Sequence, residues 1–177
     1  MKNEITGMRL RLIVMNFLQF AVWGAYLTSM GTYLFNIGLG AKIGLFYAMQ
    51  GIVSLFMPAI MGIIADRWVP AQKLYGFCHF MAAVFMVAAG WYGYVDGEAV
   101  NFGTLFTFYS LSVAFYMPTL ALTNSVAYTA LDKVKLDPVI AFPPIRIFGT
   151  IGFICSMLLT DILGFQNNYM QFFSCAC

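Results

Sequence analysis

Five long stretches of the chain are almost free of charged residues, and each is long enough to cross a lipid bilayer as one helix. Their residue ranges are 12–35, 43–65, 74–95, 100–131 and 138–163. About 20 apolar residues in a helix span the hydrocarbon layer of a membrane. A sixth apolar stretch begins at residue 169 and is too short to cross before Cys177. The pattern predicts an all-α, polytopic membrane helix bundle with five complete transmembrane helices and the start of a sixth.

The composition of the chain points to the same class of protein. Hydrophobic residues make up 62% of the sequence and charged residues 9%, whereas soluble domains carry about 25% charged residues. A soluble fold of this length could not enclose so much apolar surface in one core, so we expect the lipid bilayer to surround most of the chain. The formal net charge of +2 is too small to indicate a nucleic-acid partner.

The basic residues predict how the helices are oriented. If the N-terminus is cytoplasmic, seven of the nine basic residues lie on the inner side, namely Lys2, Arg9, Arg11, Arg67, Lys73, Lys133 and Lys135. Only Lys42 lies on the outer side, together with the acidic Asp96, Glu98 and Asp161, and Arg146 lies inside a helix. Basic residues concentrate in cytoplasmic loops of membrane proteins. We therefore expect an inner N-terminus.

The cysteine and histidine residues indicate neither a metal site nor a disulfide framework. Cys78, Cys155, Cys175 and Cys177 lie in apolar surroundings without C-x-x-C spacing, and the single His79 has no ligand neighbour in the sequence. We expect the cysteines to pack as small apolar side chains, with no metal and no cofactor. No predicted helix carries paired acids or a nucleophile and base, so an enzyme is not expected.

Several residues interrupt the apolar pattern inside the predicted helices. Proline bends a membrane helix, and it occurs at Pro58, Pro118, Pro143 and Pro144. Bent helices that line a moving cavity and ordinary bundle shape both fit these prolines. The polar residues Gln19, Gln50 and Asn124 each lie in an uncharged predicted helix. Each is compatible with a watery cavity or with a hydrogen bond between helices, and Gln19 and Asn124 are the candidates for lining a cavity.

Two groups of residues suggest contacts between helices. Gly149, Gly152 and Ser156 lie on one face of the fifth predicted helix, and small residues let helices approach closely in lipid. Gly62 precedes Asp66 and Arg67 at the inner end of the second helix. The acidic and basic pair could lock two helix bundles through charge-assisted hydrogen bonds during gating, or it could be a solvated pair in a loop.

Arg146 is a charged residue within the fifth predicted helix. Asp137 followed by Pro138 is a favourable start for a helix, and Arg146 would then lie about 12 Å along it. A cation at that depth needs a partner or water and is a candidate functional residue. If the helix instead began again at Pro143, Arg146 would lie near the inner interface and reach toward the lipid headgroups.

Short sequence blocks in all five predicted helices match one known family in chain order. The blocks are Phe17-Leu18-Gln19-Phe20 with Trp23-Gly24, Phe56-Met57-Pro58-Ala59, Gly62-Ile63 with Ala65-Asp66, Cys78-His79, Tyr116-Met117-Pro118-Thr119-Leu120, and Phe142-Pro143-Pro144-Ile145-Arg146-Ile147 with Gly149-Thr150-Ile151-Gly152-Phe153-Ile154. In these blocks the chain resembles the nucleoside–proton symporter family of the major facilitator superfamily.

The resemblance implies a twelve-helix transporter with two six-helix halves and a central site used by alternating access. It implies proton-coupled nucleoside uptake across a bacterial inner membrane. Arg146, Thr150 and Phe153 match family residues that line the nucleoside site, while the second half completes that site and carries the acid for proton coupling. Against twelve helices, this chain would be the N-terminal portion, and the missing C-terminal half would be needed for function. The superfamily's inner-loop signature continues with a glycine and two basic residues, which residues 68–73 largely replace here.

The residue types of the fifth helix suit a nucleoside. Arg146, Thr150 and Phe153 follow the spacing i, i+4, i+7, which places three side chains on one helix face. A guanidinium donates several hydrogen bonds to a base carbonyl or ribose oxygens, and an aromatic ring stacks on a base for about 1–3 kcal/mol. The remaining hypotheses are a facilitator for a sugar or another metabolite, and a non-transporting membrane assembly subunit.

Overall fold

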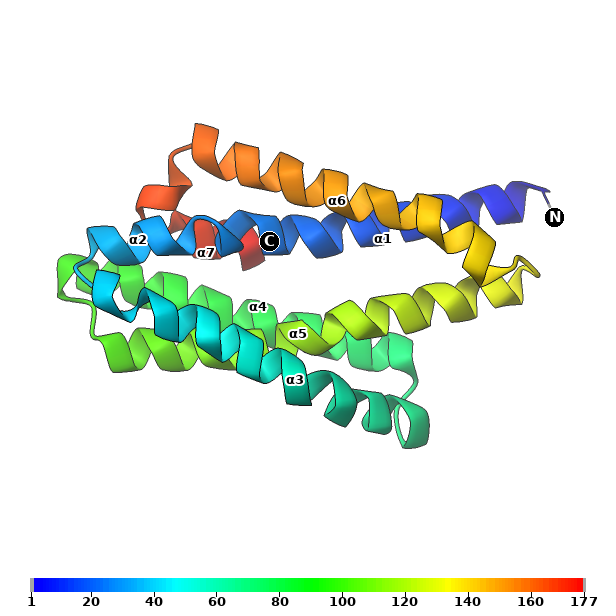
Figure 1. The fold of residues 1–177 in the computed structure, drawn as a ribbon, viewed down its shortest axis with the longest axis horizontal. Coiled ribbons are helices and arrows are strands. Elements are labelled where there is room, and N and C mark those ends of the chain that lie inside the picture. Colours follow the sequence, from blue (N-terminus) through cyan, green and yellow to red (C-terminus); the bar gives the residue numbers. More distant parts are fainter. Residues whose placement is uncertain (1, 177) are drawn as a thin grey trace.

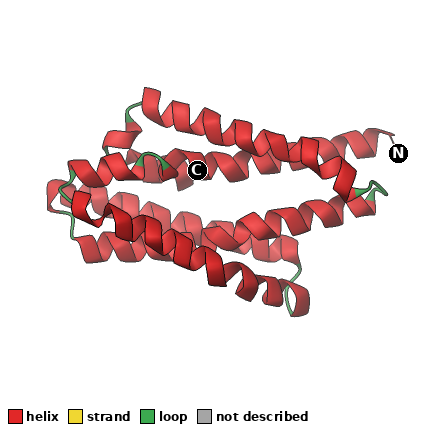
Figure 2. Cartoon of the chain, viewed as in Figure 1, coloured by secondary structure: helices red, strands yellow, loops and turns green. Residues whose placement is uncertain are grey.

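The computed structural model describes residues 2–176, apart from the side chains of Lys2, Asn3 and Glu98. This part of the chain is almost entirely helical (Figures 1 and 2). Its helices are α1 (Lys2–Leu27), α2 (Met30–Asn36), α3 (Ile43–Arg67), α4 (Ala71–Asp96), α5 (Phe102–Lys133), α6 (Pro138–Ile162) and α7 (Met170–Ala176). Short 3-10 turns at Gly40–Lys42, Gly97–Ala99 and Phe165–Asn167 join α2 to α3, α4 to α5 and α6 to α7.

The structure confirms the predicted all-α membrane bundle. Five helical segments of the described chain are long and apolar enough to cross a bilayer: Glu4–Asn36, Gly40–Arg67, Ala71–Asp96, Phe102–Lys133 and Pro138–Ile162. The first of them contains both α1 and α2, which are separated by a turn at residues 28–29. The short α7 begins the sixth segment and ends near the middle of the long axis of the bundle (Figure 1).

The helices form two groups that lie on opposite sides of the bundle. In one group α6 packs along α1, and α7 contacts α1 and α4. In the other group α3 and α4 both pack on α5. Figure 1 shows α1 and α6 running in the same direction on one side, with α3, α4 and α5 on the other side. A core of buried aromatic and aliphatic side chains joins the groups; its largest members include Tyr26, Phe46, Tyr109, Tyr116 and Phe172.

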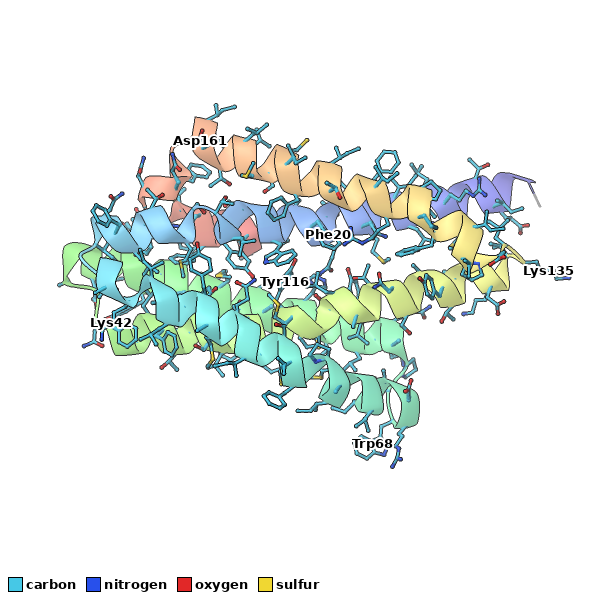
Figure 3. All side chains as sticks on the ribbon, viewed as in Figure 1. Phe20, Lys42, Trp68, Tyr116, Lys135 and Asp161 are labelled. Atoms are coloured by element: carbon cyan, nitrogen blue, oxygen red, sulfur yellow. The ribbon has the colours of Figure 1, made fainter. Side chains whose placement is uncertain are left out.

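The loops that the sequence places on opposite sides of the membrane lie toward opposite ends of the bundle. Figure 3 shows Lys42 and Asp161 in one half of the long axis, and Trp68 and Lys135 in the other half. The N-terminus lies at the same end as Lys135 (Figure 1). Between these ends, large apolar side chains such as Leu55 and Phe56 remain exposed, as expected for a surface in contact with lipid. Lys2 and Glu98 contribute to the predicted orientation, but their side chains lie outside the described part.

The described cysteines are not paired with one another. Cys78 and Cys175 are buried, whereas Cys155 is exposed on α6, and all three are free thiols. Cys177 lies outside the described residues. Within residues 2–176 no three histidine, cysteine, aspartate or glutamate side chains come together in a way that could hold a metal ion. Burial of Cys78 and Cys175 fits packing as small apolar side chains.

Candidate functional site

The start of α6 places Arg146 well inside a helix. Asp137 is the N-cap, and its Oδ1 accepts a hydrogen bond of 2.9 Å from the backbone N–H of Val139. The helix then begins at Pro138 and continues to Ile162 through both internal prolines. The predicted start at Asp137 and Pro138 is therefore confirmed, and the alternative of a new helix beginning at Pro143 is wrong. Arg146 lies in the third turn of α6.

Glycines bring the backbones of α1 and α6 into direct contact. A Cβ atom added at Gly152 would overlap the carbonyl oxygen of Phe17, and one added at Gly24 would overlap the carbonyl oxygen of Phe153. Neither overlap could be relieved by moving a side chain, because the obstructing atoms belong to the main chain. The prediction that small residues on this helix serve close packing is confirmed for Gly149 and Gly152, whereas Ser156 lines a cavity.

The guanidinium of Arg146 lies over an aromatic ring of α1. Its Cζ is 3.8 Å from the centroid of the Phe20 ring, well within the range of a cation–π contact. The described part of the chain records no hydrogen bond or ion pair to this guanidinium. Gly149 provides the space, since a Cβ there would lie 2.7 Å from Phe20 Cδ2 and 2.9 Å from Arg146 Nη1. The Arg146 side chain is half-buried.

Phe153 also packs on α1, while Thr150 does not. The Phe153 ring is half-buried and meets Trp23 edge to face, with ring centroids 6.0 Å apart and an interplanar angle of 80°. The ring centroids of Trp23 and Phe20 are in turn 6.1 Å apart. The Thr150 side chain is exposed. The three predicted site residues thus share one continuous helix, with two of them supported by aromatic side chains of α1 and the third open.

Gln19 is the centre of a buried polar network between three helices. Its Nε2 donates a 2.7 Å hydrogen bond to Thr119 Oγ1 on α5. Its Oε1 is 2.8 Å from the Tyr75 hydroxyl and 2.7 Å from His79 Nε2, both on α4. The Tyr116 hydroxyl donates to the Gln19 carbonyl oxygen at 2.5 Å. Gln19 is only 1% exposed. A buried amide without hydrogen-bond partners would destabilise the fold, and these bonds supply the partners.

The network determines which groups donate. The Thr119 hydroxyl proton is directed to the Tyr116 carbonyl oxygen at 2.6 Å, so Thr119 Oγ1 must accept from the Gln19 amide nitrogen. The Gln19 oxygen therefore faces α4 and accepts from Tyr75 and from His79 Nε2. Neutral His79 consequently carries its proton on Nε2. Gln19 thus links α1 to α4 and α5 through side-chain bonds.

A cavity of about 560 Å³ borders this network. Gln19, Tyr75, His79 and Tyr116 contribute to its wall, and the remainder is mainly apolar, including Leu18, Phe80 and Met86. Its lining among the described residues does not include the three predicted site residues of α6. Gln19 therefore lies at a cavity that does not include Arg146, Thr150 or Phe153.

The other sequence candidates lie away from both features. Asn124 is exposed on α5 and is absent from the described lining of the cavity, so its predicted role remains a prediction. Gly62 is half-buried near the end of α3 and has no atom within 4 Å of an added Cβ. Asp66 and Arg67 are exposed at the last turn of α3, and among residues 2–176 no ion pair is recorded for either. Gln50 is buried and accepts a long 3.4 Å hydrogen bond from Tyr109.

Sequence reasoning missed the residues that support the candidates. Phe20 and Trp23 support the α6 residues, and Tyr75 and Thr119 hold Gln19. One local signal was available: Tyr75 and His79 are spaced i, i+4 and so share a helix face. No local signal pairs Phe20 with Arg146, because they lie on helices far apart in the sequence.

Comparisons with known proteins identify the family of the chain. Residues 6–177 match the model of a family described as nucleoside H+ symporter. The chain is 40% identical over 166 residues to a xanthosine permease of Escherichia coli (strain K12), a match that covers 93% of this chain and 38% of the relative. It is 38% identical over 170 residues to the nucleoside permease NupG of the same organism, covering 94% of this chain and 39% of the relative.

A solved structure supports the same relationship. The crystal structure of the nucleoside transporter NupG superposes with a TM-score of 0.84 at 37% identity, covering 96% of this chain and 40% of that chain. A mutant form of the same transporter gives a TM-score of 0.88 and covers 41% of its chain. These relatives are named as permeases and transporters, not as enzymes. The chain spans about two fifths of the length of the relatives it matches.

Proposed function

Because the chain belongs to the nucleoside H+ symporter family, we propose that it supplies one wall of a transporter that carries nucleosides across a bacterial inner membrane together with protons. The proposed wall is the α6 face with Arg146, Thr150 and Phe153. The observation that supports it most is the state of Arg146: a cation inside a membrane helix, held over the Phe20 ring, with no hydrogen-bond partner among the described residues. Such a group is available to bind a ligand.

The three side chains offer complementary contacts to a nucleoside. The planar guanidinium of Arg146 donates to a base carbonyl or to ribose oxygens. The exposed hydroxyl of Thr150 can donate or accept one further hydrogen bond. The half-buried Phe153 ring, fixed against Trp23, offers an apolar face on which a base can stack. Polar and apolar recognition thus occur on one helix face.

Activity is proposed for a larger unit than the described bundle. The chain spans about two fifths of the relatives it matches, and alternating access requires two groups of helices that move around a shared site. We define the assembled transporter as this chain together with helices that correspond to the remaining part of those relatives, on the same chain or on another. The second wall of the site and the proton-coupling acid belong, in this proposal, to those further helices.

A gating role is proposed for the inner end of α3. Asp66 and Arg67 are exposed there, and Gly62 leaves open space one turn earlier. Exposed charges of opposite sign can form charge-assisted hydrogen bonds with helices of the assembled transporter. Such bonds would form in one conformation and break in the other, as alternating access requires.

An uptake assay tests the proposed function. Proteoliposomes that contain the assembled transporter are given a proton gradient directed inward, and the accumulation of labelled uridine, adenosine and glucose is compared. We expect both nucleosides to accumulate, glucose not to accumulate, and a protonophore to abolish the accumulation. Accumulation of glucose alone would favour a sugar facilitator, and no transport of any solute would favour an assembly subunit. Residues 1–177 alone should not concentrate nucleosides.

Reporter fusions test the proposed orientation. The end of the bundle that carries Lys135 and the N-terminus should face the cytoplasm, because basic loops stay on that side. A reporter active only outside the cytoplasm should therefore function when fused in the loop at residues 96–101 and fail at residues 132–137. The reverse result at either loop would contradict the proposed topology.

A further inference from the structure

The contact between Arg146 and Phe20 is unusual because it holds a cation without using its hydrogen bonds. The guanidinium Cζ lies over the ring, 3.8 Å from the centroid. A ring face attracts the cation through its quadrupole and accepts none of the five in-plane N–H donors. A carboxylate at the same place would pair with two of those donors. The ring thus fixes the position of the guanidinium and leaves its donors unoccupied.

Phe20 is itself held firmly in place. It is 8% exposed, and the adjacent residue, Gln19, anchors α1 to α4 and α5 through its three side-chain contacts. On the α6 side, Gly149 lies against both Phe20 and Arg146. Because Gly149 has no side chain, α6 can approach the Phe20 ring closely. Figure 3 shows Phe20 near the middle of the long axis, far from the charged ends marked by Lys42 and Lys135.

We propose that Phe20 is a positioning residue for nucleoside binding: its ring seats the Arg146 guanidinium and directs the free donors toward the ligand. An unsupported arginine side chain has many rotamers, and fixing one of them on binding weakens the affinity. A guanidinium that is already seated loses less entropy when the ligand binds. This inference rests on the proposed function, because it assigns Phe20 a role in the same α6 site.

The contact between the Arg146 guanidinium and the Phe20 ring can be detected without any ligand. This chain contributes four arginines, Arg9, Arg11, Arg67 and Arg146, to the assembled transporter, and in NMR of arginine labelled with nitrogen-15 the signal of Arg146 is identified by its loss in Arg146→Lys. A guanidinium over a ring face is shifted upfield by the ring current. We expect one upfield signal that is lost in Arg146→Lys, moves toward the other arginines in Phe20→Leu and stays shifted in Phe20→Tyr. The absence of a shifted signal in the unmodified assembled transporter would overturn the proposal.

Binding measurements then test the consequence. In the assembled transporter, Phe20→Leu should weaken uridine binding by roughly 3- to 30-fold, the range expected for loss of a partly desolvated cation–π contact. Phe20→Tyr retains the ring and should bind within about twofold of the unmodified protein. Phe17→Leu is the matched control: it makes the same change one turn earlier on α1, where the contact with α6 is made by the backbone, and it should leave binding unchanged.

The two measurements separate this inference from the proposed function. If the shifted arginine signal is present but the assembled transporter binds no nucleoside, the proposed function is refuted while the contact between Phe20 and Arg146 is confirmed. If uridine binds and Phe20→Leu binds as well as the unmodified protein, the positioning role is refuted. Thermal unfolding of each variant shows that the protein is folded; should Phe20→Leu not fold, the ligand-free spectrum and Phe20→Tyr still decide the outcome.

Discussion

The glycines of α6 and those of α3 look alike in the sequence but have opposite surroundings in the structure. Gly149 and Gly152 on α6 are covered by α1, so closely that a Cβ would meet Phe20 or the backbone of Phe17. Gly44, Gly51 and Gly62 on α3 have no atom within 4 Å of an added Cβ. The difference teaches that a small-residue face indicates the capacity for close packing, while the neighbouring helix decides whether this capacity is used.

The polar side chains of α1 and α3 also differ in how well they are hydrogen-bonded. On α1, Gln19 bonds to Thr119, Tyr75 and His79 at 2.7–2.8 Å. On α3, Gln50 makes one side-chain contact of 3.4 Å with Tyr109. Within the most apolar stretch of each membrane-length segment, 17% of the residues are buried in the α3 segment, against 28% in α6 and 39% in the segment of α1 and α2. We infer that α1 and α6 form a fixed frame for the site, whereas α3 keeps an open face for lipid or for helices of the assembled transporter.

The largest expected effect comes from filling a glycine in the fixed frame. Gly152→Val should destabilise this chain by about 3 kcal/mol, because the new side chain overlaps the Phe17 carbonyl and the two helices must separate. Gly51→Val makes the same change on α3, where the space is open, and should alter stability by about 0.5 kcal/mol or less. Unfolding in detergent, followed by tryptophan fluorescence, measures both. Equal losses of stability in the two variants would remove the contrast between α6 and α3.

Removing the polar link at α1 should have an intermediate effect. Gln19→Leu leaves the half-buried side chains of Tyr75 and His79 without their acceptor, at a cost of about 2 kcal/mol. Gln50→Leu removes only one long contact and should cost about 0.5 kcal/mol. The free energies of unfolding of the two variants give the comparison. A smaller loss for Gln19→Leu than for Gln50→Leu would show that the network does not hold α1.

The smallest effect is expected at the helix ends. Asp137→Ala removes the N-cap of α6 and should destabilise the chain by about 1 kcal/mol. Asp66→Ala, at the end of α3, removes an exposed carboxylate for which the described residues record no ion pair, and should leave the stability of this chain unchanged. Thermal midpoints of the two variants test this. An unchanged midpoint in Asp137→Ala would mean that the α6 start is fixed by packing alone.

Features that depend on residues close together in the sequence, such as helix length and helix starts, could be predicted. Contacts that depend on how each helix is rotated toward its neighbours could not. Hydropathy indicated five membrane-length helices, and the Asp137 cap, followed by Pro138, indicated the start of α6. The sequence predicted the same role, lining a cavity, for Gln19 and Asn124. In the structure Gln19 is buried in a hydrogen-bond network, whereas Asn124 is exposed. The partners of Gln19 lie 56 to 100 residues away, so only the packing of α1 against α4 and α5 reveals them.

The central claim, that Arg146 on α6 binds the nucleoside, is tested most directly by Arg146→Lys in the assembled transporter. If Arg146 only anchors the helix, lysine keeps the charge and uridine binding is unchanged. If its planar fork binds the ligand, lysine cannot replace it.

Isothermal titration with uridine measures the difference, with Arg9→Lys as a matched control at an exposed position. We predict that Arg146→Lys weakens binding by at least about 100-fold, because hydrogen bonds to charged groups contribute about 1.5–3 kcal/mol each, while folding and the binding of Arg9→Lys are preserved. Near-normal uridine affinity in folded Arg146→Lys would contradict the account.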